Sequence, residues 1–191
     1  MVKLSDGVPV IVYGTKENEY KVTAEQIEKA VTPKTKALVL NTPNNPTGMI
    51  YTRQELQKIA DIAIRHDFYV VSDEMYEYLI YGEEKHVSIA SLGEEIYKRT
   101  LTCSGLSKSY AMTGWRIGYV GAPAAIAKLM GAIQSNATSN PNSIAQKAAY
   151  EALTGQQDTV VSMREEFNRR RIYMYERLSG MPHVQIFEPK G

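Results

Sequence analysis

The stretch Ser104-Gly105-Leu106-Ser107-Lys108-Ser109-Tyr110-Ala111-Met112-Thr113-Gly114-Trp115-Arg116-Ile117-Gly118-Tyr119 places one lysine among small and hydroxyl side chains. Arg116 follows Lys108 in an apolar segment flanked by glycines. Small side chains let a ligand approach the backbone, and hydroxyl groups with an arginine fork suit a phosphate. A lysine shielded from water can serve as a Schiff-base amine. Most lysines are solvated surface charges, so this stretch gains meaning only together with other segments.

Two further segments carry polar side chains directly after expected strands. Asn44-Asn45-Pro46-Thr47-Gly48 follows a β-branched and leucine-rich run at 37–40, and Ser72-Asp73-Glu74-Met75-Tyr76 ends a similar run at 68–72. The lysine stretch follows a third run at 100–103. Ligands gather at the carboxyl ends of parallel strands, so the three segments are expected to form one site.

The order of expected elements predicts an α/β fold with a mostly parallel sheet and flanking helices. Capping-box spacing at Thr23 and Thr52 marks two helix starts, and a polar loop is expected over 135–142. Further strands are expected over 8–12, 117–121 and 184–187, and further helices over 92–97, 126–133, 143–153 and 158–178. The basic run at 169–171 lies on the last helix and is interpreted as a solvated face.

Taken together, the Asn-Pro-Thr-Gly, Asp-x-x-Tyr and Ser-Lys segments resemble the pyridoxal-phosphate site of class I/II aminotransferases of fold type I. The run from Ala111 to Arg116 is similar to the aspartate/aromatic branch. The resemblance covers about 2–191 and implies a partial large domain at 1–155. The connecting helix and the start of a small C-terminal domain would occupy 156–191. It further implies a central piece of a longer enzyme, with a phosphate loop and a ring-stacking aromatic before it and a carboxylate-binding arginine after it.

The resemblance assigns roles to individual residues. Asp73 would face the pyridine nitrogen of the cofactor, while Tyr76 and Asn45 would donate hydrogen bonds to its phenolic oxygen. Lys108 would form the internal aldimine and then shuttle a proton. Arg116 would clamp the phosphate.

Other interpretations stay open for these residues. Asp73 could be a helix N-cap, Asn45 a turn residue and Tyr76 a packing residue, while Glu74 is expected to be structural. Ser104 and Ser107 are both candidates for phosphate contact, because the family's serine three positions before the lysine is replaced by Gly105.

The resemblance implies an aminotransferase that moves an amino group between an aspartate-like or aromatic amino acid and a 2-oxo acid. The 191 residues alone are expected to be inactive, and the full-length protein is expected to be a homodimer. A β-lyase or decarboxylase of the same fold is an alternative, as is a folded or dimerising fragment without catalysis.

Composition limits the remaining classes. The chain has 191 residues, 43% of them hydrophobic, and a net charge of +1, which suits one soluble domain or slightly more and gives no reason to expect a nucleic acid partner. No apolar run is long enough for a spanning helix, and the start lacks the apolar core of a secretory signal. The single Cys103 excludes an intrachain disulfide and favours a cytoplasmic setting. The three histidines lack the spacing of metal ligands.

Overall fold

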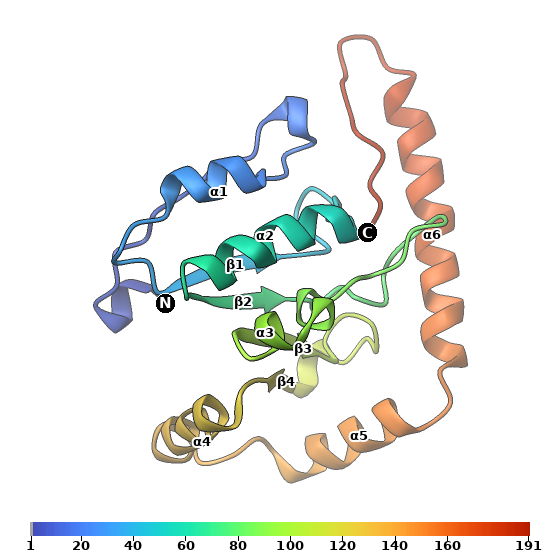
Figure 1. Cartoon of the computed structure of the whole chain (residues 1–191). Helices are drawn as coiled ribbons and strands as arrows, with labels where there is room; N and C mark the ends of the chain where they lie inside the picture. The colour runs from blue at the N-terminus through green and yellow to red at the C-terminus, as the bar shows by residue number, and fades with distance from the viewer. Residues whose placement is uncertain (1) are drawn as a thin grey trace.

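A four-stranded sheet forms the centre of the molecule in the computed structural model, which describes residues 2–191 (Figure 1). The strands follow one another across the sheet in chain order, and the first three are parallel while the fourth is antiparallel. Their bounds are β1 Ala37–Asn41, β2 Tyr69–Asp73, β3 Thr100–Gly105 and β4 Gly118–Gly121. The expected α/β fold with a mostly parallel sheet is confirmed.

The register brings the ends of the parallel strands to one edge of the sheet. Asn41 lies opposite Asp73, and Asp73 lies opposite Cys103. β4 starts directly after the lysine loop, and Gly118 lies opposite Gly105. In Figure 1 the arrows of β1 and β2 point towards the last helix and the C-terminus.

Two helices that begin with capping boxes cover one face of the sheet. α1 (Ala24–Ala30) begins at Thr23 and α2 (Arg53–Arg65) at Thr52, and each threonine exchanges hydrogen bonds with the third helical residue, as the sequence predicts. α2 buries one side against the sheet, together with α1, the 3₁₀ turn η3 (Ile89–Leu92) and α3 (Glu94–Tyr97). The buried core of this face contains Ile27, Leu40, Leu56, Ile59, Phe68, Val70, Ile89 and Ile96.

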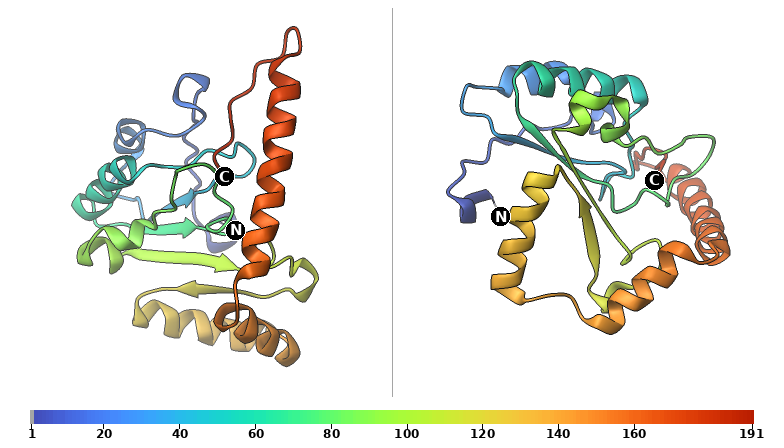
Figure 2. Two further views of the ribbon diagram at one scale, coloured as in Figure 1. Left: turned by 90° about the vertical axis from the view of Figure 1, so that its right-hand side faces the viewer. Right: turned by 60° about the horizontal axis from the view of Figure 1, so that its bottom comes forward.

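The opposite face of the sheet is open. Because side chains alternate along a strand, Val39 and Tyr69 point away from α2, and they are 64% and 44% exposed. α4 (Ala124–Thr138) and α5 (Ser143–Thr154) lie beyond β4, away from α2 (Figures 1 and 2). None of the α4 residues, all of which the structure describes, is buried.

A second, smaller core joins α5 to the lysine loop. Leu106 and Met112 of the loop are buried against Ala149 of α5, with Tyr110 and Ile117 packed around them. The loop that carries Lys108 and Arg116 is therefore held by its packing on α5 as well as by β3 and β4 at its two ends.

α6 (Asp158–Ser179) is the long helix that the sequence predicts, and it ends at Gly180. Arg169 and Arg170 pair with Glu166 on its exposed side, which agrees with a solvated face. Together they hold the pKa of Glu166 down at about 2. Arg171 differs, because its side chain is only 11% exposed and it pairs with Glu188.

Four expectations for elements are wrong in detail. Residues 8–12 and 184–187 have strand-like composition but no strand forms there. The segment 92–97 is divided, because the 3₁₀ turn η3 ends at Leu92 and α3 begins at Glu94. The loop expected over 135–142 is shorter, since α4 continues to Thr138.

The remaining 3₁₀ turns are η1 (Val2–Ser5), η2 (Lys16–Asn18) and η4 (Thr113–Trp115).

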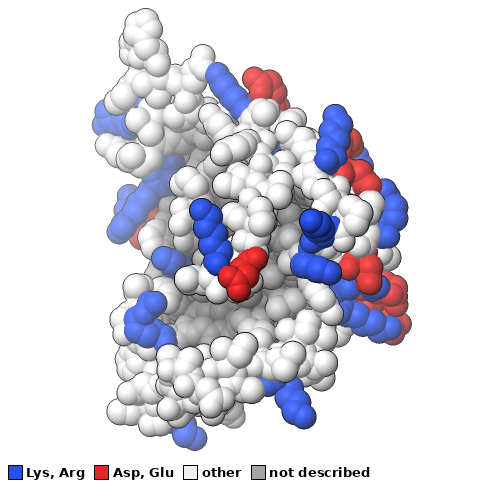
Figure 3. Space-filling view, turned by 90° about the vertical axis from the view of Figure 1, so that its left-hand side faces the viewer, with Lys and Arg blue, Asp and Glu red and all other residues white. Residues whose placement is uncertain are grey.

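Charged side chains are mixed in sign on the face that Figure 3 shows, with wide uncharged areas between them. Over residues 2–191, no helix combines the length and the apolar character that crossing a membrane requires.

Candidate functional site

The three polar segments that the sequence singles out meet where β1, β2 and β3 end. Asn45 lies in the loop after β1, Asp73 is the last residue of β2, and Lys108 follows the end of β3 by three residues. Adjacent parallel strands carry these positions side by side, so the shared edge follows from the sheet topology.

Asn45 and Tyr76 are joined directly. The Asn45 Nδ2 amide donates a hydrogen bond of 3.0 Å to the Tyr76 hydroxyl. The Asn45 backbone N–H is in turn held at 2.9 Å by the Asn41 Oδ1 atom at the end of β1. The two side chains that were assigned to the same oxygen of a ligand thus lie within reach of one such atom.

Lys108 lies beside the same tyrosine. Its Nζ atom is 5.8 Å from the centroid of the Tyr76 ring, and its side chain is exposed rather than buried. Among the ion pairs formed within residues 2–191, none involves Lys108 or Arg116. Both charges are therefore available to a ligand.

Asp73 is fixed by the backbone around it. Its Oδ1 atom accepts the Met75 N–H at 3.2 Å, and its carbonyl oxygen accepts the Asn41 Nδ2 amide at 3.1 Å. Burial raises the pKa of the neighbouring Cys103 thiol, and the nearby Asp73 and Glu74 carboxylates raise it further. These carboxylates make the electrostatic potential at this edge of the sheet negative, and a negative potential favours a protonated nitrogen.

Arg116 and the serines near it differ in their availability. Arg116 has a left-handed backbone (φ 51°), and one of its guanidinium nitrogens donates to the Thr113 carbonyl at 3.0 Å. Ser104 is buried and donates to the Glu77 Oε1 atom at 2.6 Å, so its hydrogen is already used. Ser109, which sequence reasoning did not assign, is 1% exposed, and its Oγ has no hydrogen-bond partner within residues 2–191.

Gly105 stands where part of the family has a serine, and the packing of β3 on β4 explains the glycine. A Cβ atom at this position would lie 3.1 Å from the Gly118 Cα and 3.2 Å from the Ile117 carbonyl oxygen. Both neighbours are backbone atoms, which cannot move aside easily. A side chain at position 105 would therefore require the β4 backbone to shift by a few tenths of an ångström.

The last residues of the chain form one wall of the site, which sequence reasoning missed. A cavity of about 290 Å³ is lined by Asn45, Tyr76, Pro189 and Gly191, together with Asn44, Pro46, Thr47 and Gly48. The Gly48 carbonyl accepts the Lys190 and Gly191 N–H groups at 2.7 and 2.9 Å. Arg171 of α6 also donates to the Pro189 carbonyl, at 3.0 Å. The strand expected over 184–187 stops short of these residues, and no sequence pattern placed them beside the Asn-Pro-Thr-Gly loop.

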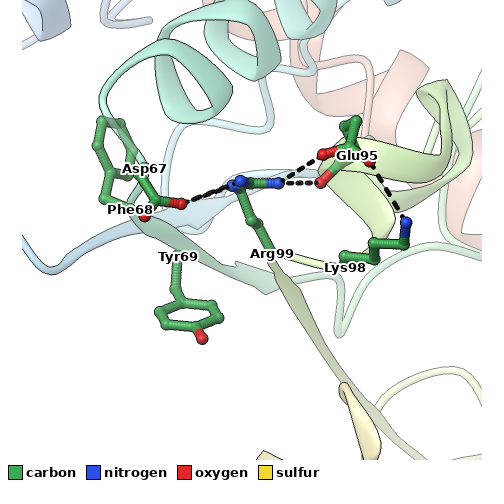
Figure 4. Close-up of a pocket in the computed structure, with 6 residues that line it drawn as sticks. All are labelled: Asp67, Phe68, Tyr69, Glu95, Lys98 and Arg99. Carbon is green, nitrogen blue, oxygen red and sulfur yellow. Dashed lines mark hydrogen bonds and ion pairs between the residues drawn. The ribbon is translucent and has the colours of Figure 1, made fainter.

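A second hollow of about 320 Å³ lies at the other end of the strands (Figure 4). Arg99 pairs there with Asp67 and Glu95, and Lys98 also pairs with Glu95. The charges that line this hollow already satisfy one another, and it shares no residue with the edge that carries Lys108.

The residues at the carboxyl edge fit pyridoxal phosphate by their chemistry. A free lysine amine is present for its aldehyde, a carboxylate for its ring nitrogen, and two hydrogen-bond groups for its ring oxygen. The exposed Arg116, which forms no ion pair within residues 2–191, has guanidinium donors that suit its phosphate.

Comparison with known proteins agrees with this chemistry. The family model described as aminotransferase class I and II matches residues 1–191. An aspartate aminotransferase of Bacillus sp. (strain YM-2) is 48% identical over 190 residues, covering 100% of this chain and 48% of the relative. Aromatic-amino-acid aminotransferase 2 of Thermococcus litoralis is 44% identical over 194 residues, covering 100% of this chain and 49% of the relative.

Solved structures give the same picture. The aspartate aminotransferase from Rhizobium meliloti superposes with a TM-score of 0.96 at 38% identity, over 100% of this chain and 48% of that one. The aromatic aminotransferase from Pyrococcus horikoshii OT3 gives 0.92 at 41% identity, over 100% of this chain and 51% of that one. The chain spans about half the length of the curated relatives it matches.

Proposed function

The chain belongs to the class I and II aminotransferase family, and we propose that it carries the cofactor site of a pyridoxal-phosphate-dependent aminotransferase. The observation that carries this proposal is the meeting of Lys108, Tyr76 and Asn45 at the strand edge that Asp73 ends. The sheet topology brings these positions to one edge, and the lysine there forms no ion pair within residues 2–191, which supports a role in binding a ligand.

Each residue has a separate task in this proposal. The Asp73 carboxylate holds a proton on the ring nitrogen, and the Tyr76 hydroxyl and Asn45 amide stabilise negative charge on the ring oxygen. When bound, pyridoxal phosphate supplies an electron sink for the bond that breaks at the substrate α-carbon. Lys108 Nζ would hold the cofactor through its aldehyde carbon and, once released, would take the proton from the substrate α-carbon and deliver it to the C4′ carbon of the cofactor.

The phosphate is assigned to the loop between β3 and β4. Arg116 supplies the guanidinium fork, and the half-buried Ser107 is the hydroxyl donor that we favour. Ser104, the other serine considered, donates to Glu77 and is the weaker candidate.

The substrates are proposed from the names of the relatives. An aspartate-like or aromatic amino acid is the proposed amino donor and a 2-oxo acid the acceptor, because aspartate and aromatic-amino-acid aminotransferases are among the relatives. We also propose the division into a cofactor domain at 1–155 and a connecting region at 156–191, a homodimeric assembly and a cytoplasmic location. Since the 191 residues span half of each relative, we do not expect them to complete the transfer by themselves.

Covalent trapping tests the proposal. The protein is incubated with pyridoxal phosphate, and borohydride then fixes the attachment as a stable secondary amine whose position is found by peptide mass spectrometry. The expected result is one dominant adduct on Lys108, which disappears in Lys108→Ala.

Lys21 is the matched control. Its Nζ lies 5.9 Å from the Tyr51 ring centroid, nearly the distance of Lys108 from Tyr76, but it pairs with Glu55 at 2.7 Å. Lys21→Ala should keep the Lys108 adduct unchanged. Labelling spread evenly over the surface lysines would contradict the assignment.

A further inference from the structure

We propose that Glu74, through a buried hydrogen-bond network with His86, is the positioning residue that aims Asp73 and Tyr76 into the site. This inference rests on the proposed function, because it concerns how two of the proposed cofactor-binding side chains are held. Glu74 itself faces away from the site and would not touch the cofactor.

The Glu74 carboxylate is buried and fully engaged. Its residue is 1% exposed, and its Oε1 atom accepts the hydroxyls of Ser72 and Ser88, each at 2.8 Å. Its Oε2 atom lies 2.6 Å from the His86 Nε2 atom. A buried carboxylate is costly unless it is paired and hydrogen-bonded, so the partners on residues 86–88 clamp this segment to the end of β2.

Because side chains alternate along a strand, the buried position of Glu74 fixes the face to which Asp73 points. Ser72 and Glu74 share the face of Val70, which is the face that α2 covers, and both are buried. Asp73 lies between them and must point to the opposite, open face. Without the hydrogen bonds of Glu74 the end of β2 could rotate, and the Asp73 side chain would no longer point into the site.

A second carboxylate, that of Glu77, holds the chain that follows Tyr76. Glu77 accepts the buried Ser104 hydroxyl at 2.6 Å, which ties the turn after β2 to the end of β3, just before the lysine loop. The Glu77 N–H also donates to the Glu74 carbonyl at 3.0 Å, and this closes the turn. Tyr76 thus lies between Glu74 and Glu77 in the chain, and their carboxylates lie within 4.8 Å of each other, whereas the Tyr76 hydroxyl and ring meet Asn45 and Lys108.

The molecule contains a matched pair for an experiment. His66 and Glu28 also approach to 2.6 Å, but they join α2 to α1 and are each 35% exposed, whereas the His86 and Glu74 side chains are 15% and 2% exposed. His86→Leu and His66→Leu therefore remove the same kind of interaction, once beside the proposed site and once far from it.

The variants are made in the full chain and compared by the dissociation constant for pyridoxal phosphate, the pH midpoint of the absorption change of the bound cofactor, and the thermal midpoint. His86→Leu should weaken cofactor binding by about tenfold or more, because misplaced contacts are lost together. The pH midpoint should rise by about half a unit or more, since Tyr76 no longer stabilises negative charge on the ring oxygen. His66→Leu should leave the dissociation constant within about twofold and the pH midpoint within about a tenth of a unit of the unsubstituted protein.

Ser88→Ala carries the test if His86→Leu does not fold, because it removes a single hydroxyl from Glu74 and should shift both quantities in the same direction by less. An unchanged pH midpoint in Ser88→Ala and in any folded His86→Leu would overturn the proposal, even if the thermal midpoint fell. Failure of the unsubstituted protein to form the Lys108 adduct would instead overturn the proposed function, and this inference with it.

Discussion

Asp73 and Glu74 are adjacent carboxylates with opposite surroundings, and this contrast is the main lesson at the residue scale. Glu74 is enclosed by two serines and a histidine, whereas the Asp73 side chain accepts only one backbone N–H, that of Met75, among the hydrogen bonds within residues 2–191. A carboxylate with spare acceptor capacity at the end of a central strand is free to bind a ligand. Both oxygens of Glu74, by contrast, already have hydrogen-bond partners.

In the full-length protein, Asp73→Asn is expected to lower amino-group transfer by about a hundredfold or more, because the neutral amide cannot balance a proton on the ring nitrogen. Trapping at Lys108 should persist, since attachment of the aldehyde does not need that charge. The measurement is steady-state turnover with an aspartate or aromatic donor, together with the fraction of protein that carries the Lys108 adduct.

Asp61→Asn is the control for this prediction. Asp61 is an exposed carboxylate on α2 that accepts a hydrogen bond from Gln57 at 2.9 Å, and its loss should leave turnover within about twofold. If Asp73→Asn also stayed within that range, Asp73 would be only a residue that caps the turn at Met75.

Residue identities could be predicted from the sequence as far as motifs define them. Asn45, Tyr76 and Lys108 lie together because each motif follows a strand, and strand order in a parallel sheet brings such positions side by side. The orientation of the Ser104 side chain could not be predicted. It depends on the face of β3 that this position occupies and on the Glu77 carboxylate that accepts its hydrogen bond. Two of the Glu74 partners, His86 and Ser88, lie twelve and fourteen residues away, and no local pattern predicts them.

At the scale of elements, the helices follow local signals and the strands depend on partners. The capping boxes at Thr23 and Thr52 form as predicted because all of their hydrogen bonds lie within four residues. Residues 8–12 have the composition of a strand, but Val8 and Val10 are 86% and 69% exposed and pair with no strand within residues 2–191. Strand propensity describes how a side chain suits a pleated surface, and it does not supply the neighbouring strand.

The contact of the lysine loop with the junction of α5 and α6 predicts that the stability of the protein depends on pH. The Tyr110 hydroxyl donates to the Gln157 Oε1 atom at 2.9 Å, at the junction of α5 and α6. Burial, with the nearby Tyr78 and Tyr119, raises the pKa of Tyr110 to about 12 from the ordinary value of 10.0. Between these two pH values the unfolded chain has released this proton while the folded chain keeps it, so stability is lost as pH rises through the window.

Tyr110→Phe should therefore flatten the fall in stability between pH values of about 10 and about 12, measured as urea midpoints at several pH values. The slope should be reduced rather than abolished, because burial also raises the pKa of Tyr51 and Tyr78. Tyr150→Phe on α5 is the control, since Tyr150 is 67% exposed, and it should retain the parent slope. Equal slopes in Tyr110→Phe and the parent would contradict the assigned origin of the pH dependence.

For the whole molecule, the distribution of apolar surface is uneven. One face of the sheet is closed by α1, α2 and α3 around a continuous core, and the other face leaves Val39, Tyr69 and Val120 exposed. α4 repeats this imbalance, because Leu129 and Ile133 are 65% and 69% exposed on a stripe that the sequence predicts as apolar. Helical periodicity correctly identified the stripe, but it cannot say what a stripe packs against.

The 191-residue polypeptide should consequently bind an apolar dye such as anilinonaphthalene sulfonate while folded, because contiguous exposed apolar surface of this kind is uncommon on single soluble chains. Replacing Leu129 and Ile133 together by Gln should reduce the dye fluorescence by about half or more, and the far-ultraviolet circular dichroism should be retained because Gln is a good helix former. Lys128→Gln changes the same helix at a polar, exposed position and should leave the fluorescence unchanged. If the double variant bound as much dye as the parent, the exposed surface responsible would lie on the open sheet face around Val39 and Tyr69 instead of on α4.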